Sequence, residues 1–148
     1  MSASELIHGC VLGSRFAEGW RGVLIEGPSG AGKSRLSLAL TAAGWRLVAD
    51  DYARVWASGG AVYATAPDTI AGRMEVRALG IVPIRHLRTV RLSLAVVHDD
   101  APERLPEPAT RGLCGLVLPR LRLDLREPQA AQVIALAARR LSQRGVLA

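Results

Sequence analysis

Short apolar stretches separated by turns fill most of the chain, and a helical spacing of apolar residues occurs in two places. The stretch Leu6–Leu12 predicts a first strand or strand edge, and a looser piece follows at residues 13–21. The segment Gly22–Ile25 predicts a clear strand that ends in a glycine-rich turn. From Lys33 the apolar residues share one helical face, and Gly44 predicts the end of that helix.

A strand and then a hairpin are predicted after this helix. The apolar run Trp45–Ala49 indicates the strand, and it stops abruptly at Asp50-Asp51. Because consecutive parallel strands joined by a helix are usually neighbours, we expect this strand to lie beside the one at 22–25. The segments 53–57 and 61–65 flank Ser58-Gly59-Gly60, which is typical of a hairpin turn.

The rest of the chain predicts three strands, a loop and a closing helix. The strands are expected at residues 80–84, 90–97 and 116–123, and the three prolines of 99–111 indicate a surface loop. Pro128 opens the last helix, and Gly145 ends it. The expected buried stripe of this helix consists of Ala130, Val133, Ile134, Ala137 and Leu141.

Length and composition predict one soluble α/β domain over residues 1–148. Hydrophobic residues make up 49% and charged residues 22%, which excludes disordered, collagen-like and fibrous chains. No apolar run reaches the roughly 18 residues that a membrane span needs, and the N-terminus lacks the basic start of a signal peptide. The two cysteines are far apart and define no disulfide framework, so we expect a cytoplasmic location.

The net charge of +6 comes almost entirely from arginine, since Lys33 is the single lysine of the chain. Such wholesale use of arginine is consistent with codon bias, and most of these residues are interpreted as a solvated surface. A basic surface nevertheless favours acidic ligands such as nucleotides or an acidic protein. The lone lysine is more informative, because of the motif in which it occurs.

A phosphate-binding motif links the strand at 22–25 to the first helix. The motif G-x-x-x-x-G-K-[ST] is matched at every fixed position by Gly27, Pro28, Ser29, Gly30, Ala31, Gly32, Lys33 and Ser34. Glycines let the backbone N–H groups turn inward toward phosphate oxygens, and the following helix begins at the anion. Lys33 is expected to reach the β- and γ-phosphates of a nucleotide, and the Ser34 hydroxyl to hold Mg²⁺.

Asp50 and Asp51 follow a predicted strand at the end where α/β proteins bind ligands. Carboxylates in this place hold magnesium in many phosphate-loop enzymes. Adjacent residues of a strand point to opposite sides, so the two carboxylates cannot have the same role. We expect one of them near the metal and the other near an incoming hydroxyl group.

Other charged residues have no special role on sequence pattern alone. Glu75 is flanked by two arginines and is interpreted as a surface ion pair, and Arg104 as a solvated charge in the proline-rich loop. His8, His86 and His98 stand without obvious partners and are interpreted as structural.

Four segments together resemble the HPr kinase/phosphorylase family, bacterial enzymes that phosphorylate a serine of the phosphocarrier protein HPr. The segments are Ile7-His8-Gly9, the loop 27–34, Arg46–Asp51 and Met74–Gly80, in the family's order and approximate spacing. The resemblance spans about residues 6 to 140 and includes only the family's catalytic domain. It implies the phosphate-loop kinase fold of the HPr kinase type.

The resemblance also implies roles for individual residues. Lys33 matches the phosphate-binding lysine, while Ser34 and Glu75 match the magnesium-holding residues. Asp51 matches the base that faces the substrate serine. His8 matches a histidine that sits against this aspartate, and Asp50 matches its acidic neighbour. Arg77 lies in the same catalytic segment as Glu75. Arg104 resembles an active-site arginine, although Glu103 and Pro106 flank Arg104-Leu105 where the family has Asp and Gly.

The implied activity is ATP-dependent phosphorylation of a serine in an HPr-type protein, with ATP and Mg²⁺ as cofactors. Family members have a P-V-R-P-G-R segment that is tied to the reverse, phosphate-driven reaction, but the arginines of Leu118–Arg126 stand at other spacings. The resemblance therefore supports the kinase reaction more than phosphorolysis. It also implies a homo-oligomer, since family members assemble as hexamers.

Two other functions remain open. A small-molecule or nucleoside-phosphate kinase shares the phosphate loop, but such enzymes usually add an arginine-bearing lid for which 148 residues leave little room. A nucleotide-binding or nucleic-acid-binding regulator without catalysis is the other possibility. The six aromatic residues and the lack of a helix-turn-helix or RRM signature argue against nucleic acid, and no membrane partner is expected.

Overall fold

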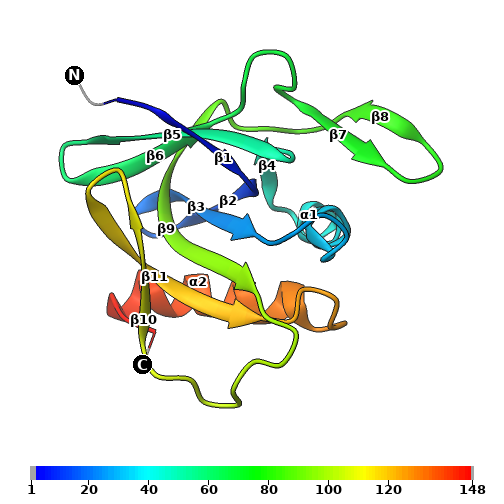
Figure 1. Ribbon diagram of the computed structural model, residues 1–148. Coiled ribbons are helices and arrows are strands. Elements are labelled where there is room, and N and C mark those ends of the chain that lie inside the picture. The colour runs from blue at the N-terminus through cyan, green and yellow to red at the C-terminus, as the bar shows by residue number, and fades with distance from the viewer. Residues whose placement is uncertain (1–2, 148) are drawn as a thin grey trace.

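The computed structural model describes residues 3–147 and has two helices and eleven strands (Figure 1). The helices are α1 (Lys33–Ala42) and α2 (Ala130–Arg144). The strands are β1 (Glu5–His8), β2 (Cys10–Phe16), β3 (Gly19–Glu26), β4 (Arg46–Ala49), β5 (Tyr52–Ser58), β6 (Ala61–Thr65), β7 (Arg73–Val76), β8 (Gly80–Pro83), β9 (Thr89–His98), β10 (Ala109–Leu113) and β11 (Leu116–Leu123). The predicted α/β class is confirmed.

Nine of the strands form one curled sheet in which β3 has a central place. The order is β1-β5-β6-β9-β3-β2-β4, and β11 also pairs with β9 and carries β10 at its other edge. The β3–β9 and β9–β11 pairs are parallel, and the other pairs of this sheet are antiparallel. The C-terminal ends of β3 and β9 therefore meet at one edge, where ligands bind in α/β folds.

Alternate residues of the central strands face two separate cores, as the side-chain period of a strand requires. On one side, Ile25 of β3 packs in a cluster with Leu36 and Leu40 of α1 and Ile134 of α2. On the other side, Leu24 belongs to a cluster with residues of β5, β6 and β11. Both helices thus cover one face of β3, and the curled part of the sheet covers the other.

Several predictions from the pattern are confirmed. The first helix begins at Lys33, and the hairpin of β5 and β6 turns at residues 59–60. The last helix ends at Gly145, whose φ of 74° places it in the left-handed region. Its N–H donates to the carbonyl of Leu141 over 2.7 Å, so a glycine cap ends the helix as expected.

The prediction of a loose segment at residues 13–21 was wrong, because β2 and β3 form a hairpin there. The two strands pair continuously from Cys10 opposite Ile25 to Phe16 opposite Gly19. This hairpin also overturns the expected strand order. The other edge of β2 accepts β4, so β2 lies between β3 and β4 and separates the strands that were expected to be neighbours.

The last helix packs through a narrower stripe than expected. Ala130, Ile134 and Ala138 are buried, whereas Val133 is 37% exposed.

Two short strands, β7 and β10, were not predicted. Strand β10 begins inside the segment 99–111 that was expected to be a loop, and it extends two residues beyond that segment. Among the described residues, neither helix has the length and apolar character needed to cross a membrane.

Candidate functional site

The predicted phosphate loop lies between β3 and α1, and glycines shape it. Gly30 and Gly32 have φ angles of 83° and 108°, which L side chains rarely adopt. Gly32 is also the N-cap of α1, and its missing side chain leaves the first amides of that helix without a capping partner. These amides and the positive end of the helix dipole are available to an anion, as the motif predicts.

Lys33 is held close to this loop. Only 6% of the residue is exposed, and its Nζ donates to the carbonyls of Gly27 at 2.5 Å and Pro28 at 3.2 Å. An ammonium group has three N–H donors, so one remains for a ligand. The single lysine of the chain is thus positioned at the start of α1 with its charge directed at the loop.

A cavity of about 400 Å³ opens in front of the loop. Its lining includes residues from four separate segments: Cys10, Ser29, Gly30, Gly32, Lys33, Ser34, Arg35, Asp51 and Arg77. The structure therefore brings together five predicted groups, namely the loop glycines, Lys33, Ser34, Asp51 and Arg77. Arg35 and Arg77 line the cavity together with Lys33, so a cavity of this size suits a negatively charged ligand.

Asp51 lies at the rim of this cavity in a constrained backbone conformation. Its φ is 69°, and the N–H of Tyr52 donates to the carbonyl of Asp50 over 2.8 Å, closing a tight turn around Asp51. Such backbone conformations are uncommon for residues other than glycine and cluster at functional sites.

The β1–β2 junction fixes Asp51 from the other side. Nε2 of His8 lies 2.9 Å from Oδ1 of Asp51, and the N–H of Gly9 donates to the Asp51 carbonyl over 2.8 Å. A side chain at Gly9 would place its Cβ 2.8 Å from the carbonyl oxygen of Ile25, so the close approach requires glycine. The predicted contact between the histidine and the second aspartate is present.

Asp50 faces a different environment, as expected for adjacent residues. Its Oδ2 accepts a hydrogen bond from the backbone N–H of Glu75 at 3.2 Å, and the Cys10 thiol lies 3.7 Å from its Oδ1. Burial raises the pKa of Asp50 above its usual value, against the lowering effect of the Glu75 N–H. Asp50 is therefore a structural link between the end of β4 and strand β7.

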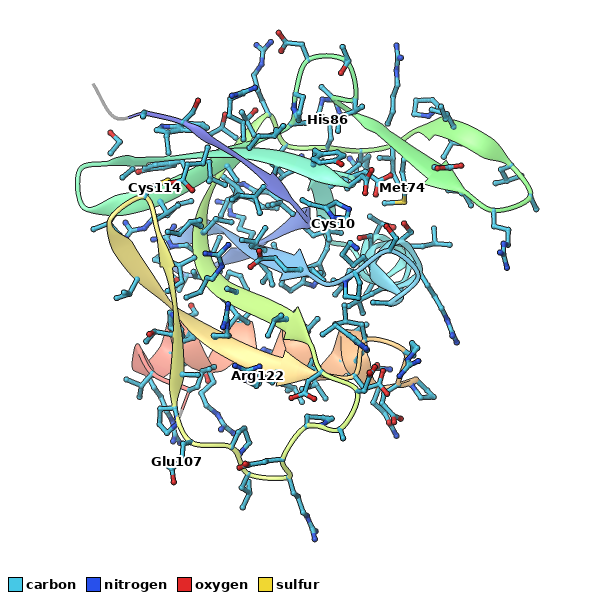
Figure 2. The ribbon with its side chains drawn as sticks, in the orientation of Figure 1. Cys10, Met74, His86, Glu107, Cys114 and Arg122 are labelled. Carbon is cyan, nitrogen blue, oxygen red and sulfur yellow. The ribbon has the colours of Figure 1, made fainter. Side chains whose placement is uncertain are left out.

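Cys10, labelled in Figure 2, begins strand β2 and is buried, with 1% of its surface exposed. Burial raises the pKa of its thiol to about 11, so the group is neutral near pH 7. It contributes an uncharged wall to the cavity, beside Lys33 and Asp50.

The predicted metal-holding residues are only partly brought together. Ser34 lines the cavity, whereas the side chain of Glu75 is exposed and lies outside the lining. Within residues 3–147, no group of three or more His, Cys, Asp or Glu side chains could hold a metal alone. A hydroxyl and nearby carboxylates are nevertheless the hard oxygen donors that Mg²⁺ takes when nucleotide phosphates complete its shell. The donor set fits a phosphate-bound magnesium ion.

Arg104 is not brought to the cavity. It lies in the loop between β9 and β10, it is exposed, and among the described residues it makes no hydrogen bond or ion pair. Its role in the site stays a prediction.

His98, interpreted from the sequence as merely structural, contacts the phosphate loop. A Cβ on Gly27 would lie 2.9 Å from the Cβ of His98, so the loop begins in direct contact with this residue. Its Nδ1 accepts the N–H of Leu125 at 3.1 Å, and its Nε2 lies 2.6 Å from Asp100. The first contact requires an unprotonated Nδ1, so the Nε2–H donates to the carboxylate.

Leu125 and Arg126 in turn contact the other end of the loop. A Cβ on Gly32 would be 3.2 Å from the carbonyl oxygen of Leu125 and 3.5 Å from the Arg126 side chain. Arg126 bridges Asp124 and Asp100 at 3.1 Å and 3.0 Å. His98 therefore connects both ends of the loop. The sequence carries a signal for this, because Asp99-Asp100 directly follow the end of β9 at His98, just as Asp50-Asp51 follow β4.

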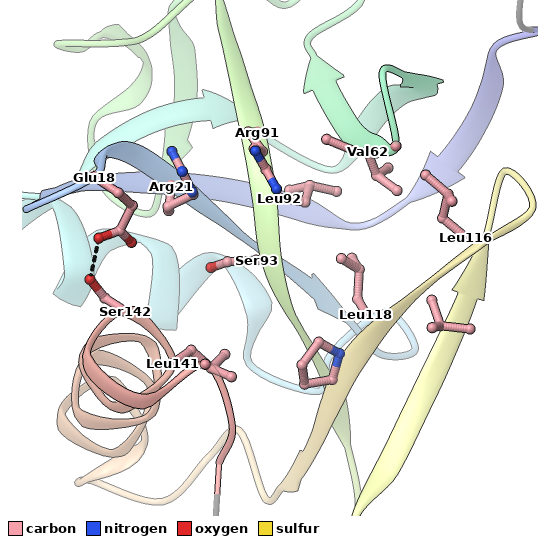
Figure 3. A pocket seen from close by; sticks show the side chains of 15 residues that line it. Glu18, Arg21, Val62, Arg91, Leu92, Ser93, Leu116, Leu118, Leu141 and Ser142 are labelled. Carbon is pink, nitrogen blue, oxygen red and sulfur yellow. Dashed lines mark hydrogen bonds between the residues drawn. The ribbon is translucent and has the colours of Figure 1, made fainter.

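A second cavity, of about 420 Å³, lies between the C-terminal end of α2 and strands β9 and β11 (Figure 3). Leu92 and Leu118 give it an apolar wall, Arg21 and Arg91 border it, and Glu18 accepts a hydrogen bond from Ser142 at 2.6 Å. None of the predicted site residues lines it. Despite its slightly larger volume, it lacks the phosphate loop and the carboxylates.

Comparisons with known proteins identify the family of the chain. The family model for the HPr Serine kinase C-terminal domain matches residues 1–144. HPr kinase/phosphorylase of Bordetella pertussis is 35% identical over 143 residues, covering 84% of this chain and 46% of that protein. The corresponding protein of Xylella fastidiosa strain M12 is 32% identical over 137 residues, covering 81% and 43%. The chain thus spans about half the length of these curated relatives.

A solved structure has the same fold. The structure described as the Hpr(Ser) kinase/phosphatase from Coxiella burnetii matches with a TM-score of 0.80 at 21% identity, covering 95% of this chain and 98% of that one. At this identity the match shows the fold alone.

Proposed function

The chain belongs to the HPr serine kinase C-terminal domain family, and from this we propose that it transfers the γ-phosphoryl group of ATP to a serine of an HPr-type phosphocarrier protein. The observation that carries the proposal is the place of Asp51. Its carboxylate, held by His8, lines the same cavity as Lys33 and Ser34. A carboxylate opposite a phosphate cradle is what the transfer to a hydroxyl group needs.

The loop and Lys33 bind the triphosphate in this proposal. The amides of residues 30–34 and the Lys33 ammonium offset the charge of the β- and γ-phosphates. Ser34 holds Mg²⁺, and Glu75 is the proposed carboxylate partner. A bound magnesium ion supplies charge neutralisation on the phosphate oxygens. Arg77 faces the same cavity and stabilises the negative charge of the transferred group.

Asp51 acts on the acceptor. It orients the serine hydroxyl in line with the γ-phosphorus and accepts its proton as the serine O–P bond forms and the P–O bond to ADP breaks. The transition state is loose, so positioning and charge stabilisation supply most of the rate and a strong base is unnecessary. His8 keeps the carboxylate oriented through the 2.9 Å contact.

The reverse, phosphorolytic reaction is not part of this proposal. Arg120 and Arg122 lie on strand β11, and Arg122 is well separated from the hairpin that carries Met74 (Figure 2). Neither lines the cavity of the phosphate loop. A homo-oligomer and a cytoplasmic location stay predictions from the family resemblance and the composition.

Incubation with labelled ATP, Mg²⁺ and an HPr-type phosphocarrier tests the proposal. The expected result is one phosphoserine in the carrier, mapped by mass spectrometry, and no product from a panel of nucleoside monophosphates. A Lys33→Met variant is the matched control and should lose both transfer and nucleotide binding. Transfer to a nucleoside monophosphate instead would indicate a nucleotide kinase. Steeply salt-dependent nucleic-acid binding without ATP turnover would indicate a regulator.

A further inference from the structure

The β7–β8 hairpin forms its own two-stranded sheet and projects from the body of the molecule (Figure 1). Its base is firmly attached. Met74 is buried with 1% of its surface exposed, and the Glu75 N–H donates to Asp50. The N–H of Ile84 also bonds the carbonyl of Gly72 at 3.0 Å. The hairpin is therefore held in a fixed position relative to the paired aspartates.

The tip of this hairpin exposes two large apolar side chains. Leu79 and Ile81 are each 72% exposed. Leu79 closes a tight turn in which Ala78 has a φ of 78° and the N–H of Leu79 donates to the carbonyl of Val76 at 3.0 Å, and Ile81 follows this turn. Isolated exposed apolar residues are ordinary, but two on one projecting element beside a cavity indicate an interaction surface.

The tip is continuous with the cavity of the phosphate loop. Arg77, on the same hairpin, lines that cavity. Leu79 and Ile81 follow it by two and four residues, so the chain can separate them from Arg77 by at most roughly 7 and 14 Å. Ile81 also pairs with Glu75 across the hairpin, and paired residues of antiparallel strands lie on the same face.

The chemistry of this surface fits a protein and not a small molecule. Leu79 and Ile81 lie beyond Arg77 along the hairpin, so a nucleotide in the cavity does not need them. A small acceptor bound in the cavity would not reach them either. The hairpin carries two arginines, Arg73 and Arg77, and one acidic residue, Glu75, so it is positively charged. The net charge of the whole chain, +6, has the same sign. An acceptor with an apolar patch bordered by acidic residues is complementary to it.

We propose that Arg77, Leu79 and Ile81 form a docking face for the protein that donates the acceptor hydroxyl. This inference rests on the proposed function and specifies how the acceptor is recognised. Docking on the hairpin places the acceptor's serine over the cavity, because the same hairpin is bonded to Asp50 beside Asp51. Leu79 and Ile81 thus contribute to the recognition of the acceptor and leave the reacting groups untouched.

The test compares Leu79→Ser, Ile81→Ser and the double variant with Val117→Ser, a matched control that is 68% exposed on β11 and remote from the phosphate-loop cavity. With an HPr-type phosphocarrier as acceptor, the double variant should raise KM by about tenfold, the effect of losing a small apolar contact. Its kcat, its affinity for a fluorescent ADP analogue and its thermal unfolding temperature should match those of the control. An unchanged KM in the double variant overturns the docking face.

Binding without transfer separates this inference from the proposed function. Calorimetry with a carrier whose acceptor serine is replaced by alanine should show weaker binding to the double variant than to the control. Wild-type binding without any phosphoryl transfer overturns the proposed function alone. No wild-type binding overturns both. A sedimentation coefficient that falls in the double variant while carrier affinity stays constant shows that the tip contacts a second copy of the chain, and this also overturns the docking face.

Discussion

Asp50 and Asp51 are adjacent in the chain, yet their carboxylates serve different partners. Asp50 accepts the N–H of Glu75 at 3.2 Å within a half-buried setting, whereas Asp51 is exposed and lies 2.9 Å from Nε2 of His8. The tight turn at Asp51, with its φ of 69°, separates the two directions. One aspartate supports the hairpin and the other faces the cavity, so substitutions at the two positions should have different consequences.

Asp51→Asn should abolish phosphoryl transfer while nucleotide affinity changes little. The amide keeps the shape of the carboxylate but cannot accept the proton of the acceptor hydroxyl. Transfer rates and the affinity for a fluorescent ADP analogue are the two measurements. An equal loss of both would show that Asp51 holds the metal or the fold instead of the acceptor.

Asp50→Asn should change how stability depends on pH. Burial raises the pKa of Asp50 in the folded protein, so over a range above the usual value the folded protein retains a proton that the unfolded chain has released. The contribution of Asp50 to stability therefore falls as the pH rises from about 4, the ordinary value for an aspartate. The free energy of unfolding of the wild type minus that of the variant, from urea titrations, should decrease with pH. An increase would contradict the raised pKa.

His98→Asn and His98→Gln should separate the two contacts of this histidine. Asn can place an acceptor near the position of Nδ1 and keep the bond from Leu125, whereas Gln extends its amide toward Asp100. Because Leu125 contacts Gly32, loss of its bond should loosen the phosphate loop. We expect the His98→Gln variant to bind nucleotide about tenfold more weakly than the His98→Asn variant, because only the Gln variant loses the hydrogen bond from Leu125. Similar affinities in both variants would show that His98 does not act through Leu125.

Arg111→Met should destabilise the protein through Glu26, the last residue of β3. The guanidinium donates two bonds to this carboxylate, from Nε at 2.9 Å and from an NH₂ nitrogen at 3.0 Å, and both side chains are less than one quarter exposed. Removing the partner leaves a poorly solvated carboxylate without its charged hydrogen bonds, at a cost of about 2 kcal/mol. Urea unfolding measures this cost. The double variant with Glu26→Gln should recover part of it, and no recovery would assign the loss to packing.

The sequence predicted the phosphate loop and its helix because local rules determine both. Glycines with positive φ, a lysine at the start of a helix and an apolar stripe need no information from distant residues. The same holds for the hairpin at Gly59-Gly60. The positions of Ser34 and Asp51 at one cavity agree with the sequence-based expectation, since strand ends and helix starts meet at one edge of the sheet.

The missed features depend on tertiary pairing. Residues 13–21 contain polar residues and a turn without an Asn-Gly signature, so their hairpin has no strong local signal. Strand β7 buries only Met74 fully, and one buried residue defines no period. The position of β4 could not be predicted because β2, an earlier strand, occupies the place beside β3. His98 was missed because its partners are Gly27 and Leu125, which are remote in the chain.

The central place of β3 has a consequence for the folding of the protein during its synthesis on the ribosome. Strand β3 ends at Glu26, but its parallel neighbour β9 begins only at Thr89, and the contacts of His98 and Leu125 with the loop follow later still. Such distant pairings form late in folding. A nascent chain that has emerged only as far as β8 therefore carries the complete glycine motif but lacks the parallel neighbour of β3 and the residues that pack against both ends of the loop.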